Sequence, residues 1–143
     1  MEIKVMAMDD YPDVFELWNS TAGMGMRSLD DSEAGIRKFI NRNPSTCFIA
    51  REGKELAGVL LAGHDGRRAY IYHTAVRENY RKHGIGRALV KAVERAVKAE
   101  GIHKIALVAF GSNENGNRFW EKMGYIVRQD LVYRDKSLND ENK

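Results

Sequence analysis

Several features are scarce or absent in this sequence of 143 residues, and each absence excludes a class of protein. With a single cysteine, Cys47, the chain cannot form an internal disulfide. No apolar run approaches the ~20 residues that a membrane-spanning helix needs. The opening residues MEIKVMAMDD lack the apolar centre and the cleavage site of a secretion signal. Since repeats, linkers and low-complexity segments are also missing, we expect one domain, residues 1–143, in the cytoplasm and not in a membrane.

The charged and metal-binding side chains leave further function classes without support. Basic residues exceed acidic ones by 23 to 20, a net charge of +3, and so small an excess gives no reason to expect a nucleic-acid partner. The histidines are not spaced as zinc ligands, so no metal is predicted; they are His64, His73, His83 and His103. A serine hydrolase is not expected, because the sequence has no Gly-x-Ser-x-Gly motif.

The spacing of the apolar residues predicts an α/β protein. Alternating or continuous apolar stretches are typical of strands, and apolar residues three and four apart are typical of helices. Strands are expected at 2–7, 46–51, 56–63, 69–76 and 102–109. Helices are expected from about Pro12, from Asp31 or Ser32, over 84–100 and over 115–123. One or two final strands at 125–134 and a frayed polar tail at 135–143 complete the order.

One unit in this order predicts where a ligand binds. Because 102–109 is rich in apolar residues, we expect it to be a central strand. Strand 69–76, helix 84–100 and strand 102–109 then form a right-handed crossover with parallel strands. The segment between the first strand and the helix lies at the carboxyl end of that strand, where open α/β sheets bind ligands.

That segment, NYRKHGIGRALV at 79–90, combines bare backbone with positive charge. Gly84 and Gly86 have no Cβ atoms to keep a ligand from the unpaired N–H groups of the helix start. The neighbouring Arg81, Lys82, His83 and Arg87 can neutralise an anion. A phosphate or pyrophosphate fits such a place. The segment is not a Walker A loop, and it lacks the third glycine of a dinucleotide fingerprint.

Two sequence blocks carry a resemblance to a known family. Arg81-x-x-Gly84-x-Gly86, after a strand that ends at Val76, resembles motif A of the GNAT superfamily of N-acetyltransferases. The block NENGNRFWEKMGY at 113–125 is similar to that family's second signature. It matches at Asn113, Gly124 and Tyr125, whereas Gly116 replaces an alanine and Trp120 replaces a tyrosine. In element order the resemblance extends to about residue 134 and implies a mixed, splayed sheet.

The resemblance implies a site for acetyl-CoA and a reaction with an amine. The pyrophosphate would lie on the N–H groups of a loop made by Lys82, His83, Gly84, Ile85, Gly86 and Arg87. The pantetheine would run along Thr74, Ala75 and Val76, and the N–H of Thr74 or Ala75 would polarise the acetyl carbonyl. Asn113 would contact the pantetheine or the pyrophosphate. Trp120 either packs against the thiol end of the cofactor or belongs to the core.

The sequence does not single out the groups that move protons. An attacking ammonium must lose a proton, whereas the thiol that leaves, with a pKa near ~8.5, is stable as a thiolate. Trp120 stands where the family often has an acidic tyrosine, and an indole N–H is not an acid near neutral pH. Tyr70, Tyr72, His73 and Tyr133 are candidates for the base, with His73 interpreted as a surface histidine. We expect no dominant catalytic residue and water-mediated deprotonation.

The acceptor side is the least determined part of the sequence. In the family, the segment between the first two helices covers the acceptor, and here it contains Met24, Met26 and Arg27. The methionines offer a pliable apolar surface, and Arg27 could pair with a carboxylate. A small amine, an amino acid and a peptide or protein N-terminus all remain possible acceptors. A non-catalytic acyl-CoA-binding sensor is the alternative function, and a homodimer is common among such domains.

Overall fold

A five-stranded mixed sheet forms the middle layer of the protein, in a computed structural model that describes all residues 1–143. The strands are β1 (Glu2–Val5), β2 (Phe48–Glu52), β3 (Glu55–His64), β4 (Ala69–Val76) and β5 (Ile105–Ala106), in this spatial order. Strands β1 to β4 pair with one another in antiparallel order, and β5 runs parallel to β4. The parallel crossover predicted from the sequence is therefore confirmed.

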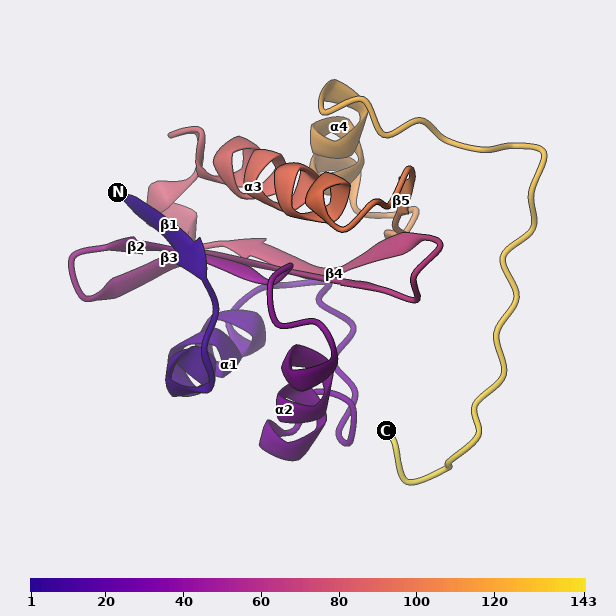
Figure 1. Ribbon diagram of the computed structural model, residues 1–143, viewed down its shortest axis with the longest axis horizontal. Coiled ribbons are helices and arrows are strands. Elements are labelled where there is room, and N and C mark those ends of the chain that lie inside the picture. Colours follow the sequence, from indigo (N-terminus) through magenta and orange to yellow (C-terminus); the bar gives the residue numbers. More distant parts are fainter.

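Helices cover both faces of the sheet (Figure 1). On one face lie α1 (Tyr11–Asn19) and α2 (Glu33–Arg42), and on the other lie α3 (Ile85–Ala99) and α4 (Glu114–Lys122). Short 3-10 turns, η1 (Met8–Asp10) and η2 (Glu78–Tyr80), precede α1 and follow β4. This order confirms the predicted α/β class and the predicted succession of elements as far as α4.

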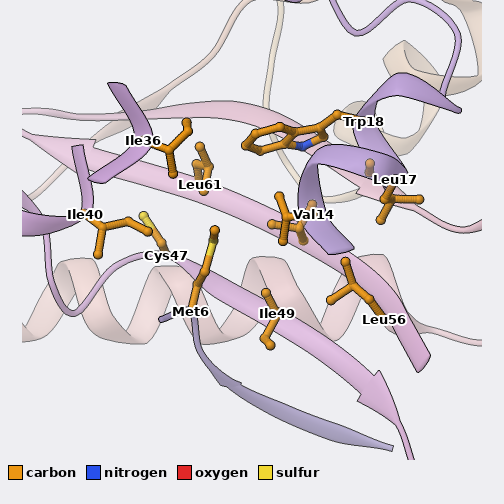
Figure 2. Packing of buried hydrophobic residues seen from close by; sticks show 12 residues of the cluster. Met6, Val14, Leu17, Trp18, Ile36, Ile40, Cys47, Ile49, Leu56 and Leu61 are labelled. Atoms are coloured by element: carbon orange, nitrogen blue, oxygen red, sulfur yellow. The ribbon is translucent and has the colours of Figure 1, made fainter. Parts of the chain in front are cut away.

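Two hydrophobic cores hold the layers together, one on each face of the sheet. Figure 2 shows the first, in which Trp18 and Val14 of α1 and Ile36 of α2 pack onto the strands. The second joins the sheet to α3 through side chains such as Leu89 and Val93. Burying apolar side chains on both faces gives β3 its continuous run of buried residues. The sheet under the site is thus rigidly supported from both sides.

The predicted strand 102–109 is much shorter than expected, and its central position is wrong. Only Ile105 and Ala106 pair with β4, and no strand lies on their other side. Val108 and Phe110 are 55% and 57% exposed. The apolar composition of this segment therefore does not reflect burial between two strands, and β5 is an edge strand.

The final strands predicted at 125–134 do not form. Residues 125–143 contain no helix or strand, and Ile126, Val127 and Val132 are at least 75% exposed. A strand needs a partner, and the chain runs away from β5 after α4 (Figure 1). The polar tail at 135–143 was expected to be frayed, but its last two residues are held in place. Asn142 and Lys143 form hydrogen bonds with residues 28–30.

Candidate active site

The sheet opens between β4 and β5. The two strands pair only at Ala69 with Ile105 and at Tyr70 with Ala106. From Ile71 to Val76, β4 has no strand on this side. The sheet is therefore splayed, as expected, and the free backbone edge of β4 can accept an extended ligand as an added strand.

A bulge interrupts β4 beside this opening. Val59 pairs with Ala75 and Leu61 with Tyr72, so that His73 and Thr74 both lie opposite Leu60. His73 has φ +40, and its carbonyl accepts a hydrogen bond from Trp18 Nε1 at 3.0 Å. A bulge re-aims side chains, and a non-glycine residue with positive φ is strained. The backbone is thus deformed at the residues expected to meet the acetyl group.

The second strained residue, Lys82, lies in the loop before α3. Lys82 (φ +67) and His73 are the chain's two non-glycine residues with positive φ. Gly84 precedes the helix with φ +80 and offers no side-chain cap, whereas Ser32 caps α2 and Asn113 caps α4. The first N–H groups of α3 are therefore open to an anion, at the positive end of the helix dipole.

A cleft of about 850 Å³ connects these features. It is bounded by the end of β4, the loop before α3, one face of α4 and part of the loop after α1. Among the predicted residues, its lining includes Met24, Thr74, Ala75, Val76, Arg81, Lys82, Gly84, Ile85, Gly86, Arg87 and Asn113. The structure thus brings together the two sequence blocks and one methionine of the predicted substrate loop.

The charge of the cleft has one sign. Five basic side chains line it and no acidic one does; they are Arg81, Lys82, Arg87, Arg118 and Lys122. None of the five takes part in a salt bridge. Although the net charge of the whole chain is small, positive charge is concentrated where backbone N–H groups are open, which favours a polyanionic ligand.

Sequence reasoning missed the part of the lining that α4 supplies. Arg118, Phe119 and Lys122 face the cleft together with Asn115. Their spacing of three and four residues places them on one helix face. That periodicity was visible in the sequence, but it did not indicate which side of α4 meets α3.

The two glycines of the loop have different reasons to be glycine. A Cβ at Gly84 would meet nothing within 4 Å, but φ +80 disfavours a side chain there. A Cβ at Gly86 would lie 3.1 Å from the Phe119 ring. Gly86 therefore permits close packing of α3 against α4, in addition to the backbone access for which it was predicted.

Thr74 carries an unusual hydroxyl group. Its Oγ1 is the one buried side-chain oxygen or nitrogen in the chain without a hydrogen-bond partner. An unpaired buried hydroxyl costs free energy, and such groups are often completed by a ligand. Because Thr74 lines the cleft beside the bulge, its hydroxyl can turn toward a bound molecule without breaking an existing hydrogen bond.

Asn113 both caps a helix and lines the cleft. Its Oδ1 accepts a hydrogen bond from Gly116 N at 3.0 Å, while its Nδ2 donates to no protein group. The capping role and the ligand-binding role are compatible, because they use different atoms of the side chain.

Of the two positions predicted for Trp120, at the thiol end of the cofactor or in the core, the structure favours the core. It does not line the cleft, and it stacks edge-on between Phe119 and Tyr125 at centroid distances of 5.0 and 5.2 Å. The helix turns its neighbour Phe119 to the cleft instead. His83 is exposed in the loop and also lies outside the cleft lining.

Tyr70 and Tyr72 lie on the face of β4 that meets α2, away from the cleft lining. Their rings are 4.7 Å apart, and Tyr72 packs edge-on against Phe39. Burial raises the pKa of Tyr70 to about 12 and also raises the pKa of Tyr72. Both hydroxyls therefore stay protonated at neutral pH in the free protein, which does not favour either as a base.

The interpretation of His73 as a surface histidine is wrong. The bulge turns its side chain toward α1, next to the cleft but outside its lining, where it is 16% exposed and its ring stacks edge-on against Trp18. His73 Nε2 lies 2.8 Å from Asp31 Oδ1. Thus the imidazole is held by a carboxylate, an arrangement that strand periodicity alone could not predict.

The predicted substrate loop packs against the rest of the protein through its methionines and the N–H of Arg27. Met24 lines the cleft, and Met24 and Met26 both pack against the first core. The N–H of Arg27 donates to Asp31 Oδ2 at 2.7 Å, while its guanidinium makes no ion pair. The loop therefore lies where it can cover a second substrate.

Comparisons with known proteins agree with this site. The model of the acetyltransferase (GNAT) family matches residues 11–125. Acetyltransferase SG1711 of Sodalis glossinidius is 30% identical over 143 residues, 100% of this chain and 99% of its own. Ard1 from Thermoplasma volcanium has a TM-score of 0.79 at 19% identity, over 89% of this chain and 83% of its own. An aminoglycoside acetyltransferase from an uncultured soil metagenomic sample has a TM-score of 0.76 at 23% identity, over 96% of both chains.

These matches establish the class that the splayed sheet and basic cleft define. The chain belongs to the GNAT family of acetyltransferases. It is an acetyl-CoA-dependent N-acetyltransferase. No helix has the length and apolar character to span a membrane, and no group of three or more potential ligand side chains is arranged to hold a metal ion.

The position of Trp120 leads to a testable difference between two neighbouring residues. Trp120→Phe is expected to lower the free energy of unfolding by about 1 kcal/mol, because the smaller ring leaves the aromatic stack incompletely filled. Affinity for acetyl-CoA, measured by isothermal titration calorimetry, should remain that of the wild type. Phe119→Leu, which changes the cleft lining, should weaken binding. An equal loss of acetyl-CoA affinity in both variants would show that Trp120 also contacts the cofactor.

Proposed function

We propose that this enzyme transfers the acetyl group of acetyl-CoA to a primary amine and that acetyl-CoA occupies the cleft between β4 and α3. The observation that carries the proposal is the free edge of β4, which a bulge interrupts and which opens into a cleft whose charged lining residues are all basic. An extended pantetheine can pair with that edge, and its phosphates then reach the start of α3.

The residues of the loop suit the phosphates. The N–H groups of Lys82 to Arg87 would hold the pyrophosphate, with Arg81, Lys82 and Arg87 supplying charge. Arg118 and Lys122 of α4 add cations from the opposite wall. Asn113 can donate from Nδ2 without giving up its cap. The fit rests on open donors and unpaired cations, which are the groups that a phosphate-rich ligand completes.

The thioester end would lie at the bulge. When bound, acetyl-CoA supplies an activated acetyl group. Its thiol has a pKa of ~8.5, so it can leave as a thiolate. The N–H of Thr74 or Ala75 would donate to the acetyl oxygen as negative charge develops there. The Thr74 hydroxyl, which has no partner in the protein, would be a second donor. Buried donors of this kind act strongly because little water competes with them.

The acceptor would approach from the side of the loop after α1. Met24 links that loop to the cleft, and the exposed Arg27 could bind an acceptor carboxylate. One structural relative is an aminoglycoside acetyltransferase. For this reason amino sugars are included among the acceptor classes to be compared. A primary amine fits the proposal because its neutral form is a strong nucleophile toward a thioester.

The test is CoA release from acetyl-CoA across a panel of amines: amino acids, polyamines, aminoglycosides and peptides with varied N-termini. Each acceptor is paired with its N-blocked derivative, which should give no release above background. Mass spectrometry of the product should place the acetyl group on nitrogen. Transfer to a hydroxyl group, or no transfer to any amine while acetyl-CoA binds, would contradict the amine proposal, and the second result would favour a binding-only module.

A further inference from the structure

A buried acid and an imidazole meet next to the bulge, and the roles proposed so far do not use them. The side chains of Asp31 and His73 are 6% and 16% exposed, and Asp31 Oδ1 lies 2.8 Å from His73 Nε2. The N–H of Arg27 donates to the other oxygen of Asp31, and Tyr11 Oη donates to the Asp31 carbonyl at 2.7 Å. Asp31 is thereby fixed from two segments of the chain.

The charged surroundings of His73 are simple. Asp31, from the loop before α2, is the one charged group in contact with the ring, and α1 contributes the uncharged Trp18. The neighbouring titratable groups are Tyr72 on β4, Tyr11 at the start of α1 and the exposed Arg27 and Asp30 in the loop. Since both tyrosines stay protonated, Asp31 determines which nitrogen of His73 carries the proton.

This arrangement leaves one nitrogen of His73 available. With Nε2–H donating to Asp31, the neutral ring has its lone pair on Nδ1. Nδ1 makes no hydrogen bond to the protein and is not fully buried. His73 also directly precedes Thr74, whose donors would meet the acetyl oxygen. The backbone of His73 is strained at φ +40, and strained residues cluster at active sites.

We propose that His73, oriented by Asp31, is the general base that takes a proton from the acceptor ammonium, directly or through one water. This proposal rests on the proposed function of the cleft. It replaces the expectation that no single residue dominates, and it extends the site by a carboxylate 42 residues away in sequence.

The ammonium R–NH3⁺ gives one proton to Nδ1 and becomes R–NH2, and its nitrogen pair attacks the thioester carbon. The C–N bond forms, the C–S bond breaks, and the electron pair leaves on sulfur. The second nitrogen proton passes to the thiolate or to solvent, and the imidazolium releases its proton to water. The products are the N-acetylated amine, CoA and one proton.

The decisive experiment compares pH profiles of kcat/KM for the wild type and His73→Gln, on one acceptor that the wild type uses. Glutamine can still donate to Asp31 but is not a base. We expect a loss of about 100-fold at pH 7 that shrinks to a few-fold near pH ~10, where the amine deprotonates unaided. His103→Gln, the same change at an exposed histidine, should show neither effect. A loss that is equal at every pH would overturn the proposal and leave a structural role.

A second measurement does not depend on turnover. Nitrogen NMR of the free protein should show neutral His73 protonated at Nε2 and not at Nδ1, and Asp31→Asn should disturb this tautomer and lower kcat/KM at least tenfold. Protonation at Nδ1 in the wild type would overturn the proposal. If the wild type acetylates no amine, the proposed function fails, and this inference fails with it. A normal wild type with an unchanged His73→Gln profile would overturn only the inference.

Discussion

Gly84→Asp should weaken acetyl-CoA binding about 100-fold or more, whereas Gly84→Asn should weaken it only a few-fold. The two side chains have the same shape, and both residue types tolerate positive φ better than other non-glycine residues. A Cβ at position 84 meets no protein atom within 4 Å, so neither change disturbs the packing. At an effective dielectric constant of ~20, two like charges about 5 Å apart repel by roughly 3 kcal/mol. The charge, not the bulk, should therefore decide the affinity.

Calorimetric titration of the two variants with acetyl-CoA measures this difference. Acetyl-pantetheine, which has no phosphates, is the matched ligand control, and both variants should accept it equally as a substrate. Added salt should narrow the gap in acetyl-CoA affinity, because screening weakens charge repulsion. An aspartate at the start of α3 interacts favourably with the helix dipole, by about 0.3–1 kcal/mol. The strain of a side chain at φ +80 is common to both variants, so a loss of stability cannot explain weaker binding by Gly84→Asp than by Gly84→Asn. Equal affinities of the two variants would place the phosphates elsewhere.

Local sequence patterns predicted the elements that position the cofactor loop. Strand 69–76 is found as Ala69–Val76, and helix 84–100 is found as Ile85–Ala99. In both segments the apolar spacing reflects burial against neighbours that are close in the chain. The glycine loop was recognisable for the same reason, because φ +80 at Gly84 and an uncapped helix start are local properties.

Features that depend on distant partners were not predictable in this way. The apolar residues of 102–109 suggested a central strand and those of 125–134 one or two final strands, yet β5 pairs at two positions and the final strands do not form. Strand formation depends on the pairing partner, whereas the apolar pattern is only a local signal. A sequence read segment by segment cannot identify an edge strand.

The candidate site shows the same limit at the scale of one residue. Strict alternation along β4 would place His73 and Tyr72 on opposite faces. The bulge adds one residue to the strand, so that both side chains face the layer of α1 and α2. The partnership of His73 with Asp31 depends on that single extra residue. The motif could indicate the proposed cofactor side of the site, but not the pairing of His73 with Asp31.

Thr74→Val should lower kcat about 10- to 100-fold and make the protein more stable. The hydroxyl of Thr74 is buried without a partner in the free protein. Replacing it by a methyl group removes a desolvation cost of about 1–3 kcal/mol and keeps a β-branched residue in the strand. If the hydroxyl donates to the acetyl oxygen during reaction, the same change removes one donor to the developing charge, a loss that can reach ~10²–10³ when a donor is essential.

Two measurements with opposite signs make this prediction specific. The midpoint temperature of thermal unfolding of Thr74→Val should rise by about 3 °C if the free energy of unfolding increases by ~1 kcal/mol. KM for acetyl-CoA should change little while kcat falls, since the interaction strengthens only as charge develops. Thr74→Ser is the matched control, because it keeps the hydroxyl and should retain most of kcat. A Thr74→Val enzyme of normal kcat would restrict the donor role to backbone N–H groups. A parallel rise in KM would instead assign the hydroxyl to holding the pantetheine.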